Sequence, residues 1–115
     1  MPHRFIFGYG VISTGDKIET EFKIDPGEIY GTTEIDSEEY EIYPSIENDS
    51  PYADVCKCFV GQVLSLMADG TYEIVEGSTS DIAIKMLQIA NDKKFGVLKE
   101  KFGTLNWILF EVWDA

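Results

Sequence analysis

The sequence predicts an α+β domain in which an antiparallel, twisted sheet of about five to seven strands packs on one main helix. A helical pattern of apolar residues with capping signals covers about residues 79–94. Other segments alternate apolar and polar residues, as half-buried strands do, and Asp69-Gly70 is typical of a hairpin turn. With 115 residues, of which 44% are hydrophobic, the chain is expected to form a single domain over residues 1–115.

The N-terminal segment predicts a β-hairpin. Arg4 to Ile12 is aromatic and β-branched, which favours a strand, and Gly8 and Gly10 mark irregularity or close backbone approach within it. After a turn at residues 13–16, Lys17 to Ile24 alternates apolar and charged side chains. This period of two predicts a second strand that pairs with the first.

The middle of the chain predicts short strands. Glu28 to Ile35 indicates a short strand broken at Gly31, and Glu38 to Tyr43 indicates a strand with Tyr40 and Ile42 on the same side. The composition of the following stretch, up to Tyr52, predicts a loop.

Residues 54–67 fit either a strand or a helix. The β-branched residues and the Asp-Gly pair that follows favour a strand that turns into a hairpin. An apolar stripe from Val55 to Met67 also fits a helix, with Pro51 near its start. The strand is preferred, and the helix is the alternative.

The main helix is expected at about residues 79–94. Each hydroxyl side chain at residues 78–80 can cap its first turn, and Asp81 suits the positive end of its dipole. Gly96 can adopt the left-handed conformation that ends a helix. One broad apolar face is formed by Ile82, Ala83, Met86, Leu87, Ile89 and Ala90.

Two further strands are expected after the helix, at Val97 to Lys101 and at Thr104 to Trp113, on either side of Phe102-Gly103. The last strand is apolar on both faces. We therefore expect it to be central in the sheet or to meet a further surface.

The charge of the chain is strongly one-sided. The net charge is −12, and residues 25–54 contain ten acidic residues without a lysine or arginine. Four of the nine basic residues lie between Lys93 and Lys101. A polarised surface of this kind repels nucleic acids and anionic membranes and attracts basic partners.

No motif for catalysis, cofactor binding or metal binding is evident. Gly8-Tyr9-Gly10 lacks the third glycine and the lysine of phosphate-binding loops, and the acidic segments lack calcium-loop spacing. His3 is the only histidine, and Cys56 and Cys58 are expected to be reduced thiols, at least one of them buried. We expect no enzyme activity, cofactor or metal. Without a membrane-spanning run or a signal-peptide pattern, we expect a cytoplasmic protein.

The string KEKFGTL, from Lys99 to Leu105, resembles a segment of uncharacterised small bacterial and phage proteins. In those proteins it follows a helix and precedes an aromatic strand. Trp107 and Phe110 are the aromatic residues of the corresponding strand expected here. The resemblance implies a helix-then-strand layout and a prokaryotic or phage origin, and it carries no activity. The basic residue that usually follows the leucine is Asn106 in this chain.

The acidic segment suggests a function. Carboxylates interspersed with tyrosines suit a surface that docks on a basic protein partner. We expect an inhibitor, in the first place an immunity protein that blocks the basic active site of a nuclease toxin. The alternative is a phage anti-defence protein that mimics nucleic-acid phosphates, and a third reading is a small ligand-binding domain or enzyme. The expected contact residues are Glu34, Asp36, Glu38, Glu39, Tyr40, Glu41, Tyr43, Glu47 and Asp49.

Overall fold

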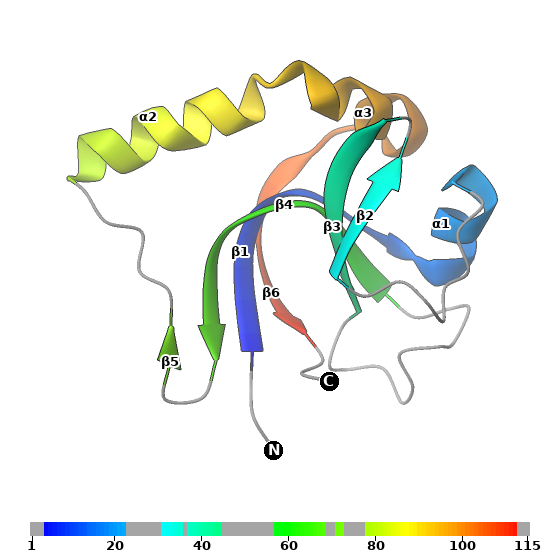
Figure 1. Ribbon diagram of the computed structural model, residues 1–115, viewed down its shortest axis with the longest axis horizontal. Helices are drawn as coiled ribbons and strands as arrows, with labels where there is room; N and C mark the ends of the chain where they lie inside the picture. Colours follow the sequence, from blue (N-terminus) through cyan, green and yellow to red (C-terminus); the bar gives the residue numbers. More distant parts are fainter. Residues whose placement is uncertain are drawn as a thin grey trace.

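The computed structural model describes residues 4–22, 31–35, 37–44, 57–68, 71–72 and 78–112. It confirms an α+β architecture with an antiparallel sheet. The elements in chain order are β1 (Arg4–Thr14), α1 (Gly15–Phe22), β2 (Gly31–Ile35), β3 (Glu38–Pro44), β4 (Lys57–Ala68), β5 (Thr71–Tyr72), α2 (Thr79–Ala90), the 3-10 turn η2 (Lys93–Phe95), α3 (Gly96–Phe102) and β6 (Asn106–Val112) (Figure 1).

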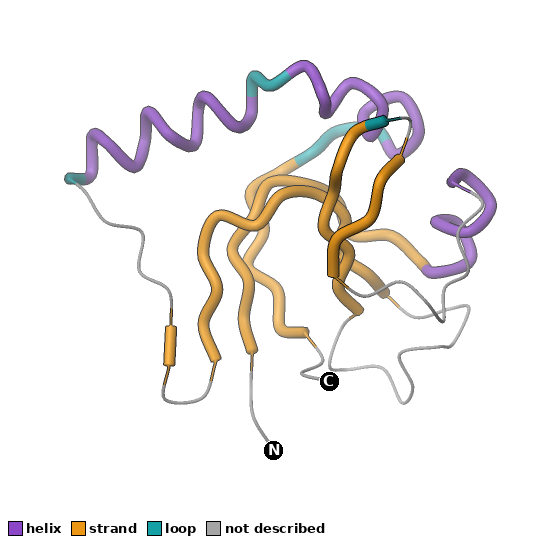
Figure 2. Tube along the Cα trace, viewed as in Figure 1, coloured by secondary structure: helices purple, strands orange, loops and turns teal. Residues whose placement is uncertain are grey.

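The sheet has the strand order β2-β3-β4-β1-β6, and β5 pairs separately with β4. The two long strands β1 and β4 pair over their whole length and bend together into an arch (Figure 1). α2, η2 and α3 lie on the outer, convex side of this arch (Figure 2). The inner, concave side is therefore the face opposite the helices.

Two glycines face each other in the pairing of β1 with β4. Gly10 of β1 lies opposite Gly61 of β4. A Cβ atom on Gly10 would collide with the carbonyl oxygen of Val60, and one on Gly61 would collide with the carbonyl oxygen of Tyr9. The backbones approach more closely here than any side chain allows, so the expected close approach at Gly10 is confirmed.

The larger core cluster lies on the convex side. Tyr9 from the centre of the sheet meets Phe95 of η2 edge to face, with ring centroids 5.1 Å apart, and its ring centroid lies 5.3 Å from that of Trp107. The buried members of this cluster are Tyr9, Ile18, Tyr40, Ile42, Cys58, Val60, Phe95, Leu98 and Leu105. A smaller cluster of Ile6 and Phe59 lies on the concave side, with Tyr43, Val63, Ile108 and Phe110 against it. Apolar residues thus cover both faces of the sheet.

Two expected strands are helices. Residues 15–22 form α1, whose first turn is capped by Thr14: its Oγ1 accepts a hydrogen bond of 3.2 Å from the backbone N–H of Lys17. Residues 96–102 form α3, which buries Leu98 completely. Each of these short helices packs on the core through one buried apolar side chain, Ile18 in α1 and Leu98 in α3. The period-two pattern of Lys17 to Ile24 therefore predicted the wrong element.

The expected main helix also needs correction. Ser78 is its N-cap, as one of the three expected candidates, and forms a capping box with Asp81. The helix ends at Ala90, however, and none of its residues is buried. Gly96 has right-handed helical φ and begins α3 instead of ending a helix. η2, α3 and α1, rather than α2, therefore supply the buried helical residues of the core.

The remaining strand expectations are mostly confirmed. β1, β3 and β6 form where expected, and the preferred strand at residues 57–68 is β4, which pairs with β5 in a hairpin. β6 is not central: it is the last strand in the sheet order. Residues 31–35 of the strand expected at 28–35 form β2. Residues 23–30, most of the loop expected up to Tyr52, and Cys56 lie outside the described residues.

Candidate partner-binding surface

Four of the eleven acidic residues of the described chain lie on the hairpin of β2 and β3. Glu34 lies directly opposite Glu39, and Ile35 lies opposite Glu38. The connection includes Ser37, whose φ of 69° is in the left-handed region. The carboxylates of Glu34, Glu38 and Glu39 are all exposed. We call these three residues the acidic hairpin surface, in which Glu38 lies on the opposite face of the strand pair from Glu34 and Glu39.

Strand alternation divides the acidic residues between two faces. Glu39, Glu41 and Tyr43 alternate with Tyr40 and Ile42, which are buried on the convex side. Glu34 shares the face of Glu39 because the two lie opposite each other. The expected placement of Tyr40 and Ile42 on the same side is confirmed, and Glu38 shares that side.

Tyr40 is not an exposed anchor. Its side chain is only 1% exposed, and its ring centroid lies 6.2 Å from that of Phe95. Its hydroxyl donates a hydrogen bond to the backbone carbonyl of Lys94. The residue thus ties the hairpin to η2, and its assignment to the contact surface is corrected.

Glu41 also has a role within the sheet. The pairing of β3 with β4 ends at Glu41 and Gly61. Beyond that point the Glu41 Oε1 accepts a hydrogen bond of 2.9 Å from the backbone N–H of Val63, and Oε2 accepts one of 3.3 Å from the Tyr43 hydroxyl. For the N–H of Val63, the carboxylate thus takes the place of a backbone acceptor on β3. The same carboxylate also holds the Tyr43 hydroxyl.

A lysine lies beside the acidic residues. Lys94 of η2 lines a hollow of about 300 Å³ together with Glu39, Glu41 and Gln62. Its Nζ also lies 5.3 Å from the centroid of the Phe95 ring. Residues 25–54 contain no lysine or arginine, but the surface around Glu39 and Glu41 does contain a lysine, Lys94. Sequence reasoning missed this because the chain brings Lys94 back to β3 from a distant position.

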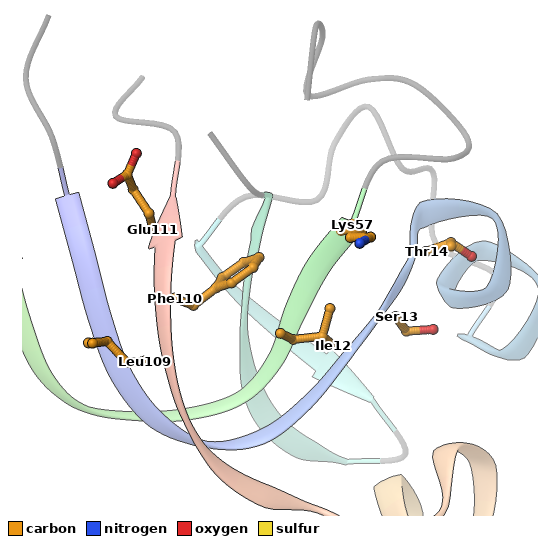
Figure 3. A pocket seen from close by; sticks show the side chains of 7 residues that line it. All are labelled: Ile12, Ser13, Thr14, Lys57, Leu109, Phe110 and Glu111. Atoms are coloured by element: carbon orange, nitrogen blue, oxygen red, sulfur yellow. The ribbon is translucent and has the colours of Figure 1, made fainter. Parts of the chain in front are cut away.

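A second hollow, of about 420 Å³, lies near the start of β4 and the end of β6. Figure 3 shows that Phe110 and Ile12 point toward the space between these strands, with Lys57 beyond them and Leu109 directed away from Phe110. Its lining residues are Ile12, Ser13, Thr14, Lys57, Leu109, Phe110 and Glu111. The sequence analysis did not find this hollow, because its residues come from three strands that pair only in the folded chain.

Three expected contact residues, Asp36, Glu47 and Asp49, lie outside the described residues. Within the described part, no group of three or more histidine, cysteine or acidic side chains is placed to hold a metal ion. None of the described helices has the length and apolarity that crossing a membrane requires. Comparisons with protein-family models, with curated proteins and with solved structures found no match for the chain.

Proposed function

We propose that the chain is a stoichiometric protein inhibitor that binds a basic protein partner through its acidic hairpin surface, as an immunity protein covering the active site of a nuclease toxin. The observation that carries this proposal is the direct opposition of Glu34 and Glu39 on paired strands. Like charges in this position destabilise a hairpin by up to about 1 kcal/mol. Within the hairpin the two carboxylates repel each other, whereas a basic partner would neutralise both.

The hairpin offers a partner two kinds of interaction. Its glutamates attract a basic surface over long range and accelerate encounter. Among the described strands β2 is also the terminal one, so the N–H and C=O groups of its outer edge are placed to pair with an added strand. Backbone pairing at this edge takes the place of the tyrosine anchors, since Tyr40 is in the core and Tyr43 is half-buried.

The proposal is tested by charge reversal. Glu38→Lys and Glu39→Lys together should slow association with a partner captured from the native host by about tenfold or more at low salt. Glu19→Lys and Glu100→Lys are the matched control, because both residues are exposed and the change in net charge is the same. Equal association rates for the two double variants would contradict the proposed surface.

The alternative partner is a nucleic-acid-binding effector bound by a phage anti-defence protein. The same acidic hairpin surface serves either target, because both present basic sites that hold phosphates. The two are distinguished by activity: an immunity protein abolishes cleavage by one toxin, whereas an anti-defence protein releases a whole defence complex from its nucleic acid. The captured partner decides between them.

A small ligand-binding domain is the third candidate, and the hollow beside Ile12 and Phe110 is the observation that favours it. An apolar wall with nearby hydroxyls and Lys57 suits a small amphipathic molecule. A thermal-shift screen tests it: compounds that stabilise the native chain but not the Phe110→Ala variant would support this function, and a screen without such compounds would reject it.

A further inference from the structure

Within the described residues, no strand pairs with the outer edge of β6. β6 is the terminal strand of the sheet, and β1 is the one strand that pairs with it among the described residues. The pairing runs from Val112 to Asn106 without a bulge. Its sequence, NWILFEV, contains a single charged residue and no proline. Apart from Glu111, β6 therefore lacks the charges, prolines and bulges with which sheet edges usually avoid pairing with other chains.

The side chains around this edge are apolar on both faces. Ile108 and Phe110 pack against the concave cluster, and Trp107 packs against the convex cluster. Leu109, in the middle of the strand, is 69% exposed, the highest exposure among the large apolar residues of the described chain. An exposed apolar surface along a strand edge indicates a protein–protein interface.

The distribution of charge determines which partner fits. The chain as a whole carries −12, so most of its surface repels a second copy. β6 itself carries one acidic residue, Glu111, whereas β2 and β3 together carry four acidic residues. The acidic hairpin lies at the opposite end of the sheet order. Of the two sheet edges, the β6 edge is thus the one that a second copy of this chain can approach.

We propose that β6 pairs antiparallel with β6 of a second copy, so that the two sheets continue across a dimer. Full overlap of residues 106–112 places Leu109 opposite Leu109 of the second copy, and Ile108 opposite its Phe110. Each copy has one β6 edge, so the twofold arrangement closes at two chains. The acidic hairpins then lie at the two far ends, where their mutual repulsion is smallest.

This proposal is independent of the inhibitor function, and its first test needs the chain alone. Sedimentation and light scattering over a concentration series should give twice the chain mass of 13.0 kDa. Leu109→Lys should weaken self-association by about tenfold or more, because two lysines would face each other. Ile84→Lys on α2 is the matched control, since Ile84 is also exposed, at 53%, and lies outside β6. The mass of the assembly that Ile84→Lys forms should equal that of the wild-type assembly at each concentration.

Cross-linking tests the register and remains informative if Leu109→Lys folds poorly. In a parent chain that carries Cys56→Ser and Cys58→Ser, a short bis-maleimide reagent should link two chains of Leu109→Cys. It should leave that parent and its Ile84→Cys variant as single chains. A monomer at every concentration, an assembly larger than two chains, or a dimer lost in Ile84→Lys but kept in Leu109→Lys would overturn the proposal.

Discussion

Glu41 illustrates at the level of a single residue how an acidic side chain can serve the fold. Replacing it with Ala removes the acceptor for the Val63 N–H, while Glu41→Gln keeps an acceptor oxygen. We expect Glu41→Ala to lower the free energy of unfolding by about 1 kcal/mol, and Glu41→Gln by clearly less. Urea denaturation of both variants measures this. Equal losses would show that the carboxylate charge, and not the hydrogen bond, stabilises the sheet.

The acidic residues of the hairpin were predictable only in part. Alternation along β3 correctly separated Tyr40 and Ile42 from Glu39, because a period of two is a local property of a strand. The burial of Tyr40 under η2 was not predictable, since it depends on Phe95 and Lys94, which arrive from a distant part of the chain. A tyrosine among glutamates has the same local pattern whether it faces solvent or the core.

Gly10 and Gly61 lie opposite each other where the backbones of β1 and β4 leave no room for a Cβ atom, so their replacement acts on the β1–β4 pair. We expect Gly10→Ala and Gly61→Ala each to lower the free energy of unfolding by about 2 kcal/mol, because the new Cβ meets backbone that cannot move aside. Gly96→Ala is the control. Gly96 has helical φ and open space around it, so alanine there should be neutral or stabilise by up to about 1 kcal/mol. Chemical denaturation compares the three, and an equal loss in Gly96→Ala would contradict the steric explanation.

The helix α2 was predicted well as a helix and poorly as a part of the core. The capping box and the apolar face are local features, and both are present in the sequence. Which face of a helix is covered depends on tertiary structure: only Ile89 and Ala90, at its C-terminal end, pack against the core cluster. The errors at α1 and α3 have the opposite origin, because these helices are so short that a single buried residue, Ile18 or Leu98, determines their packing.

The loose packing of α2 predicts local opening. Its N-terminal turns depend on the capping box at Ser78 and have no buried residue. Ser78→Ala should accelerate hydrogen exchange of amides 82–86 by about fivefold, with little change in the global free energy of unfolding. Exchange followed by mass spectrometry, together with urea denaturation, separates the two quantities. A global loss of about 1 kcal/mol would instead indicate that α2 unfolds only with the whole domain.

The molecule as a whole has a nearly neutral sheet edge at β6 and an acidic edge at β2. The sequence predicted a polarised molecule, because positions 25–54 contain ten acidic residues and no lysine or arginine. It could not predict that Lys94 lies beside Glu39, or that β6 is terminal, since strand order is set by pairing across the whole chain.

Two opposite responses to salt follow from this arrangement. Between low and physiological ionic strength the Debye length falls from about 30 Å to about 8 Å. Attraction between the acidic hairpin surface and a basic partner is then screened, so association with the partner should slow. Repulsion between two copies of charge −12 is screened as well, so self-association through β6 should strengthen. Stopped-flow association and sedimentation in the same buffers measure both. If salt moved the two processes in the same direction, the acidic hairpin and the β6 edge could not both have the roles proposed for them.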